Sequence, residues 1–120
     1  MSYKRGDIVL LPFPYTDQSG SKRRPALILS TDAYDGRRMD IIVAPITGNL
    51  ATRQPDDTPL SDWSAAGLLK PSVVKGILGT VQQTLVVRVL GTLTAADLLK
   101  VEHTFANALA LAVMPPATSA

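Results

Sequence analysis

The sequence contains no cysteine, which excludes disulfides, cysteine-based zinc sites and a thiol nucleophile. It contains a single histidine, His103, so one subunit cannot build a metal site or an acid–base pair from several imidazoles. No apolar run approaches the ~18 residues that a membrane helix needs. The first residues lack the apolar segment of a signal peptide. We therefore expect a cytoplasmic protein with no membrane association.

Signatures of nucleotide-binding proteins and of common hydrolases are also missing. The sequence has no GxGxxG, no P-loop and no GxSxG motif. What is present is a chain of 120 residues, 46% of them hydrophobic and 18% charged. This composition favours one folded domain over disorder. We assign residues 1–114 to that domain and expect residues 115–120 to form a frayed tail.

Charge is distributed unevenly along the chain. Residues 1–38 carry a net charge of +3, residues 39–69 a net charge of −3, and residues 70–120 a net charge of +2. A basic end beside an acidic middle suggests an anionic partner that binds at a defined place.

Short apolar runs between polar loops predict strands over residues 8–13, 25–30, 39–46, 72–78 and 85–90. Residues 32–36 predict a turn or a single helical turn. Residues 61–67 predict a short helix that ends at Gly67. Several strands followed by a C-terminal helix are typical of an α+β fold with an antiparallel or mixed sheet, and not of a βαβ nucleotide fold.

The C-terminal helix is expected to begin after Thr94 and to run to about Val113. Thr94 and Asp97 form a capping box, in which hydroxyl and carboxylate each accept a hydrogen bond from a backbone amide. The apolar residues that share one face of this helix are Leu98, Val101, Phe105, Leu109 and Ala112. His103 falls away from this face, where solvation is more typical than catalysis.

A hydroxyl-rich loop and a basic cluster, Ser19 to Arg24, lead directly into the predicted strand that begins at Pro25. Pro25 restricts Arg24 to extended backbone, so its guanidinium leaves the chain from a fixed point. Arg23 is expected on the opposite side of the strand. Backbone amides, hydroxyls and guanidinium groups together suit phosphate. A second candidate is the end of the third strand, where Thr47 and Asn49 place a hydroxyl and an amide at the mouth of a loop.

Three motifs occur in an order that is typical of one family. Arg5 to Pro14 is RGDIVLLPFP, Gly20 to Ser30 is GSKRRPALILS, and Ala44 to Thr47 is APIT. Gly67 to Lys75, GLLKPSVVK, is similar to a further block in one branch of the family. The set resembles the PemK/MazF toxins, and the resemblance extends from about Arg5 to Leu111.

The resemblance implies a small SH3-like β-barrel of the CcdB/PemK type with a C-terminal α-helix, working as a homodimer. It implies the toxin component of a type II toxin–antitoxin system, with a cognate antitoxin protein as partner. The implied activity is a metal-independent endoribonuclease that needs no cofactor and cuts single-stranded mRNA at short sequences. By motif, Arg24 and Thr47 match the catalytic arginine and threonine, and Lys75 matches a basic residue in the cleft.

The chemistry of such an enzyme suits these residues. RNA carries its own nucleophile, the 2′-hydroxyl, so Arg24 is assigned to stabilise the phosphorane and Thr47 to bind a phosphate oxygen. Tyr15 either stacks on a base or anchors its loop. Asp17 is the nearest carboxylate for a general base, or else forms a turn. The residues predicted to contact RNA are Tyr15, Gln18, Ser19, Ser21, Lys22, Asn49 and Lys75.

Two other functions stay open. A toxin of the same fold could bind DNA gyrase without catalysis, although clustered arginine and threonine favour the nuclease. A degenerate member could bind antitoxin or RNA without cutting, because the segment after Lys75 lacks the acidic residue that some members carry.

Overall fold

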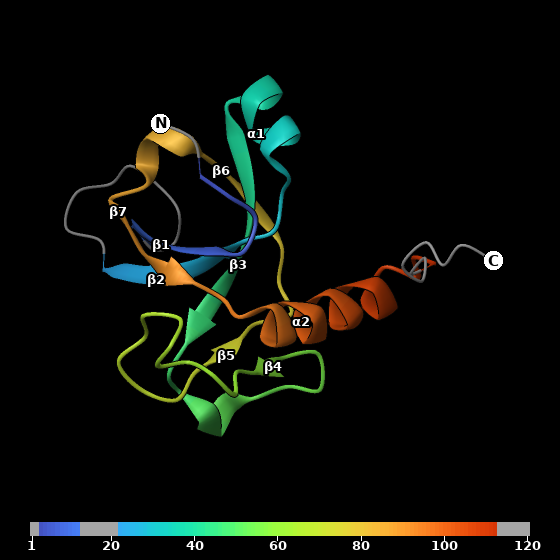
Figure 1. Cartoon of the computed structure of the whole chain (residues 1–120). Helices are drawn as coiled ribbons and strands as arrows, with labels where there is room; N and C mark the ends of the chain where they lie inside the picture. Colours follow the sequence, from blue (N-terminus) through green and yellow to red (C-terminus); the bar gives the residue numbers. More distant parts are fainter. Residues whose placement is uncertain (1–2, 13–21, 113–120) are drawn as a thin grey trace.

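The computed structural model describes residues 3–12 and 22–112 (Figure 1). The strands in these residues are β1 (Asp7–Pro12), β2 (Arg23–Ile28), β3 (Asp40–Thr47), β4 (Thr58–Pro59), β5 (Val73–Val74), β6 (Gly79–Gln82) and β7 (Arg88–Thr92). The helices are α1 (Asp32–Arg38) and α2 (Ala95–Ala108), with short 3-10 turns at η1 (Leu50–Thr52) and η2 (Gln83–Leu85). No helix in this part of the chain is long and apolar enough to cross a membrane.

All the strand pairs are antiparallel, and the strands follow the order β4-β5-β3-β2-β1-β7. The long strand β3 has a second partner, because β6 pairs with its first half and β5 with its end. The prediction of an α+β fold with an antiparallel sheet and a C-terminal helix is confirmed. Within the described ranges, the two end strands β4 and β7 do not pair with each other. The barrel therefore stays a prediction.

The central strands are buried on both faces. Ile8 and Val9 are neighbours in β1 and both are fully buried, although their side chains point to opposite sides of the sheet. One side holds the cluster of Ile8 and Leu27 that includes Val101 of α2. The other holds Val9 together with Val81 of β6. Burial on both faces explains why these strands have continuous apolar sequences and not alternating ones.

Several predicted elements differ from the structure. The strand predicted at 72–78 is only the two-residue β5, and β6 and η2 occupy residues that were predicted as loop or strand. Residues 61–67 form a turn and not a helix, because only the Ala66 amide bonds back across four residues before Gly67 adopts a φ of +90°. Residues 32–36 belong to the longer helix α1. The predicted strands at 8–13, 25–30 and 39–46 correspond to β1, β2 and β3 with shifted ends, and Phe13 lies outside the described residues.

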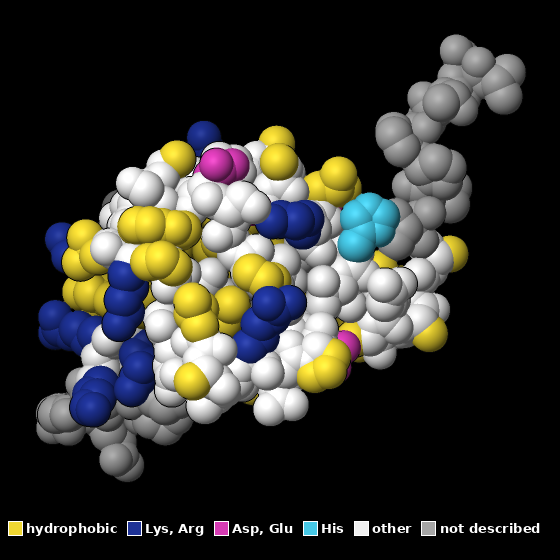
Figure 2. Space-filling model, turned by 90° about the horizontal axis from the view of Figure 1, so that it is seen from below, with side chains coloured by type: hydrophobic (Ala, Val, Ile, Leu, Met, Phe, Trp, Pro, Cys, Tyr) yellow, Lys and Arg dark blue, Asp and Glu magenta, His cyan; other side chains and the backbone are white. Residues whose placement is uncertain are grey.

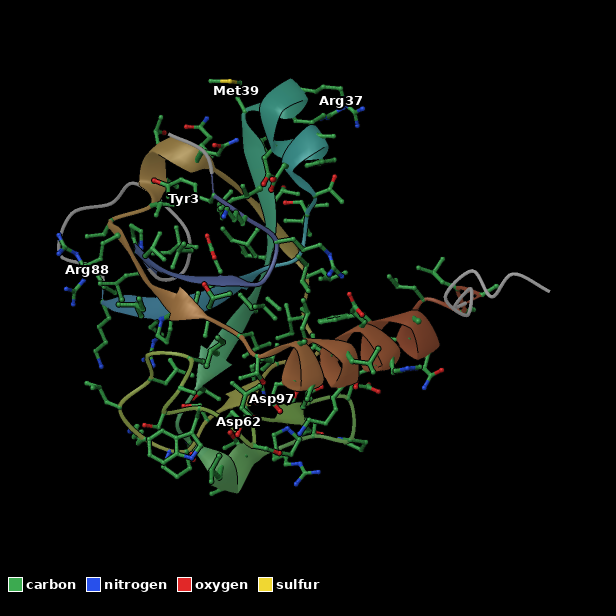
Figure 3. The ribbon with its side chains drawn as sticks, viewed as in Figure 1. Tyr3, Arg37, Met39, Asp62, Arg88 and Asp97 are labelled. Carbon is green, nitrogen blue, oxygen red and sulfur yellow. The ribbon has the colours of Figure 1, made fainter. Side chains whose placement is uncertain are left out.

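Only half of the predicted capping box forms. The Thr94 hydroxyl accepts a hydrogen bond from the Asp97 amide at 3.3 Å, as expected. The buried Asp97 carboxylate instead accepts from the amides of Ser61 and Asp62, at 3.1 and 2.8 Å, and from Lys100 at 3.0 Å. Burial alone would raise the pKa of Asp97, but these donors lower it below its usual value. Asp97 therefore fastens the start of α2 to the 61–62 turn (Figure 3).

The helix α2 is shorter than predicted. It ends at Ala108, where the Leu109 amide donates to the Phe105 carbonyl at 2.9 Å and Ala110 adopts a φ of 56°. Leu109 and Ala112 are exposed and do not extend the packed face, whereas Leu98, Val101 and Phe105 do pack against the core. The tail at 115–120 lies outside the described residues.

Candidate functional site

The candidate site lies where β2 begins and β3 ends. A cavity of about 460 Å³ and a smaller one of about 230 Å³ open there. The residues that line both are Arg24, Ile46, Thr47 and Asn49. The two cavities are therefore neighbours, with Arg24 and Thr47 between them.

The strand register brings Arg24 to Thr47. Ala26 of β2 pairs with Pro45 of β3 in an antiparallel ladder. Continuing this register by two residues puts Arg24 opposite Thr47. Arg24 also pairs with Leu11 of β1, so its backbone is held on the other side as well. The guanidinium and the hydroxyl thus leave two strands whose relative positions the sheet fixes.

Thr47 and Asn49 are joined by a local hydrogen bond. The Asn49 amide donates to the Thr47 hydroxyl oxygen at 3.1 Å, and the Asn49 side-chain oxygen accepts from the Ala51 amide at 3.2 Å. The Thr47 hydroxyl accepts this hydrogen bond, and within the described part of the chain it donates none. Its proton can therefore be offered to an oxygen of a bound ligand, with the oxygen atom held in place by Asn49.

Lys75 lines the smaller cavity together with Arg24 and Thr47. Its ammonium forms an ion pair with Asp57 at 2.7 Å, and its side chain is 19% exposed while that of Asp57 is 3% exposed. The amides of Gln54 and Gly76 also donate to the Asp57 carboxylate, at 2.8 and 2.9 Å. Burial by itself raises the pKa of Asp57, but the hydrogen bonds from Lys75, Gln54 and Gly76 outweigh it and hold that pKa below its usual value.

Sequence reasoning missed Asp57. It is separated by 17 residues from Lys75, and its aspartate-rich neighbourhood is typical of an exposed polar loop. The structure places this carboxylate beside Lys75, where the sequence after Lys75 has no acid of its own. Because both of its oxygens already accept hydrogen bonds, its evident role is to hold Lys75 at the cavity wall.

Asp57→Asn is expected to destabilise the fold by about 2 kcal/mol at neutral pH. The substitution removes the buried carboxylate charge that accepts several hydrogen bonds, and Lys75 loses its ion-pair partner. The lowered pKa means that the wild-type advantage is fully present above the unfolded-state pKa near 4 and is lost as the pH falls through the folded-state value. Urea unfolding of both proteins across pH 2–7 measures this. An equal stability at pH 7, or a difference that grows on acidification, would contradict the assignment.

The other predicted site residues either line a cavity, lie away from both cavities, or fall outside the described residues. Lys22 is exposed and is not among the residues that line either cavity. Tyr15, Asp17, Gln18, Ser19 and Ser21 lie outside the described residues. Arg23, which is expected on the opposite side of the strand from Arg24, also lines the larger cavity. The cavity extends to the Leu10–Pro25 side of the sheet, where alternation along β2 places Arg23.

Two more basic residues at the larger cavity were not singled out from the sequence, namely Lys70 and Arg88. Seen from below, most of the visible Lys and Arg side chains lie toward the left end among hydrophobic ones, and others lie near the middle of the face (Figure 2). In the residues that the structure describes, no three His, Cys, Asp or Glu side chains are grouped as a metal site would require. The site is thus basic, and guanidinium, ammonium and hydroxyl donors line its cavities.

Comparisons with known proteins agree on one family. The sequence model of the family of PemK-like, MazF-like toxins of type II toxin–antitoxin systems matches residues 4–109. The Mycobacterium tuberculosis toxin MazF-mt6 has a similar structure, with a TM-score of 0.72 and 25% identity over 89% of this chain and 99% of that one. MazF from Deinococcus radiodurans has a TM-score of 0.73 and 25% identity over 92% of this chain and 99% of that one. No curated protein matches the chain significantly.

A further structure shows the same fold in a complex. The MazE–MazF structure from Deinococcus radiodurans has a TM-score of 0.74 and 24% identity, over 93% of this chain and 99% of that one. The family match covers nearly all of the described fold, including both strands that carry Arg24 and Thr47. The chain belongs to the family of PemK-like, MazF-like toxins of type II toxin–antitoxin systems.

Proposed function

We propose that this toxin is a metal-independent, sequence-specific endoribonuclease that cleaves single-stranded mRNA by attack of a 2′-hydroxyl. The observation that carries the proposal is that Arg24 of β2 and Thr47 of β3 both line the two neighbouring cavities. A phosphate bound there would have the larger cavity on one side and the smaller cavity on the other. A planar guanidinium and a hydroxyl donor are the groups that such a phosphate needs.

In the proposed reaction, the 2′-oxygen forms a bond to the adjacent phosphorus and the bond to the leaving 5′-oxygen breaks. A base takes the 2′-proton, and the 5′-oxygen gains a proton. Arg24 would donate to the phosphorane oxygens, where charge accumulates, and Thr47 would donate to a phosphate oxygen. One such donor is typically worth about 3–4 kcal/mol in the transition state. The products are a 2′,3′-cyclic phosphate and a 5′-hydroxyl.

The general base is proposed to be Asp17, which lies outside the described residues. Asp57 does not suit that role, because its carboxylate is occupied by Lys75, Gln54 and Gly76. Lys75 in turn would contact a flanking phosphate through the ammonium protons that Asp57 leaves available. Lys22, Asn49 and the hydroxyl-rich loop before β2 would hold the strand nearby.

Similar structures support the choice of partners. One is a mycobacterial endoribonuclease with its cognate antitoxin, and another is a MazE–MazF complex. We propose that this chain likewise binds a cognate antitoxin, acts as a homodimer and works in the cytoplasm on mRNA. The basic surface around the cavities suits an acidic inhibitor as well as RNA.

Cleavage of a long RNA should persist in EDTA and should yield discrete fragments. Primer extension would map the cut sites, and treatment of the fragments with phosphatase and kinase would identify the ends as 2′,3′-cyclic phosphate and 5′-hydroxyl. Activity that disappears in EDTA and returns with magnesium would contradict the proposal. Intact RNA together with gyrase-dependent DNA breaks would instead identify a gyrase poison.

A further inference from the structure

The larger cavity continues beyond Arg24 and Thr47 into a part of the molecule that the proposed chemistry does not use. Lys70 and Arg88 line it there, together with Leu10, Leu68 and Leu90. Of the described residues that line it, none is acidic. The smaller cavity differs, since its ammonium group at Lys75 is already paired with Asp57. Lys70 and Arg88 therefore add positive charge to the larger cavity.

Lys70 is held across the turn that follows Thr47. A Cβ atom added to Gly48 would fall 2.1 Å from Cε of Lys70 and 3.0 Å from its Nζ. The lysine side chain thus lies in the space that only glycine leaves open. Its backbone is restrained too, because Pro71 favours extended backbone at Lys70 and the Ser72 hydroxyl donates to the Lys70 carbonyl at 2.8 Å. Lys70 is thus an exposed residue whose backbone is restrained and whose side chain lies over Gly48.

Arg88 reaches the same cavity from the opposite wall. It pairs with Leu10 of β1, which pairs in turn with Pro25 of β2, so the three side chains face the same side of the sheet. Figure 3 shows Arg88 at the edge of the sheet, near the start of β2.

A close backbone approach brings the two walls together. A Cβ atom on Gly91 of β7 would lie 2.1 Å from the Ala66 carbonyl oxygen, and one on Gly67 would lie 2.3 Å from the Leu90 carbonyl oxygen. The 66–67 turn therefore packs directly against β7. Residues 68–70 follow from that turn and line the same cavity as Arg88 and Leu90 of β7.

We propose that this cavity binds the nucleotide next to the scissile phosphate, with Lys70 and Arg88 on the neighbouring phosphate and the leucines against its base. The inference rests on the proposed function, since it assigns a subsite to the same RNA strand. A volume of about 460 Å³ lies in the range of sites that hold one small ligand, and so suits one nucleotide. Cations beside an apolar wall match a nucleotide's phosphate and base.

Salt dependence of binding tests the inference. The probe is a short single-stranded oligonucleotide with deoxyribose throughout, carrying the sequence cut in the primer-extension assay, or a mixed sequence if nothing is cut. It keeps every phosphate and has no 2′-hydroxyl, so binding is measured without cleavage. Because both cations contact the same phosphate, the slope of log K against log salt should be shallower by about 0.7 for the Lys70→Gln, Arg88→Gln double variant, with each single variant between it and the wild type.

Two further variants serve as controls. Arg37→Gln removes the same charge on α1, far from Arg88 (Figure 3), and should leave the slope unchanged. Gly48→Ala changes no charge, and the flexible end of Lys70 can move aside, so its slope should stay close to that of the wild type. Combining Gly48→Ala with Lys70→Gln should then add little. Circular dichroism and thermal unfolding establish that each variant is folded.

The outcomes separate this inference from the proposed function. A double variant that keeps the wild-type slope while the wild type cuts RNA overturns the subsite alone. A wild type that does not cut RNA, yet shows the shallower slopes in its variants, contradicts the nuclease and supports the subsite. Variants that weaken binding of purified antitoxin but leave the oligonucleotide slope unchanged would assign the cavity to a protein partner and overturn the inference.

Discussion

Replacing Arg24 by glutamine is expected to lower kcat for RNA cleavage by at least about 100-fold, the loss typical of removing one preorganised donor to a developing charge. Arg24 lies near the beginning of strand β2, where Pro25 restricts its backbone and Leu11 of β1 pairs with it. The backbone that carries the guanidinium is therefore fixed before RNA binds. KM should change less than kcat, because the charge that Arg24 meets is largest in the phosphorane.

Single-turnover cleavage of one mapped RNA substrate measures this effect. Arg24→Lys keeps the positive charge and loses the planar fork, so we expect it to remain strongly impaired. Arg37→Gln is the matched control for loss of charge on another element, and it should cleave like the wild type. Thermal unfolding checks that the half-buried position tolerates each change. Cleavage by Arg24→Gln within tenfold of the wild type would rule out the assigned role.

A single deoxyribose at the cut nucleotide is expected to abolish cleavage while binding is retained. The substitution removes only the 2′-hydroxyl that serves as nucleophile, and the phosphates that Arg24, Lys70, Lys75 and Arg88 would contact are unchanged. The dissociation constant should stay within a few-fold of that of the all-RNA strand. Such a strand should also act as a competitive inhibitor of the cleavage of normal RNA.

Gel-based cleavage and fluorescence anisotropy on the same oligonucleotide measure both effects. A deoxyribose one nucleotide away from the cut site is the matched control and should leave cleavage nearly intact. Cutting of the substituted strand at the normal rate, or products that carry a 5′-phosphate, would identify water as the attacking group. The roles of Arg24 and Thr47 would then have to be reassigned to an activated water.

Much of the fold could be predicted from local sequence. Continuous apolar runs identified β1, β2 and β3, because strands that are buried on both faces have no polar side. Thr94 marked the start of α2, because its hydroxyl needs only the amide three residues later. Short elements were predicted poorly. β4, β5 and β6 are held by partners distant in sequence, and a run such as Val73–Val74 carries too little periodicity to identify them.

The length of α2 shows the same limit. Leu109 and Ala112 continue its apolar periodicity, yet the helix ends at Ala108 and both side chains are exposed. The apolar periodicity shows which face of a helix would pack against the core. How many turns of that face are covered depends on the size of the core surface, which the rest of the fold determines. Asp97 is a second example, since its carboxylate binds the 61–62 turn and not the helix terminus.

By itself, the sequence indicated the family, the positions of the main strands along the chain, and Arg24 and Thr47 as the residues that match the family motifs. These depend on neighbours along the chain, such as the proline after Arg24. Only the tertiary structure decided which groups surround them. Pairing of β2 with β3 brings Arg24 and Thr47 to the same two cavities, Asp57 reaches Lys75 from a separate loop, and Lys70 lines the cavity of Arg88 beside the close approach of Gly67 to Gly91. Contacts of this kind join segments far apart in the chain, and their geometry is set by strand pairing and backbone packing, which no local pattern encodes.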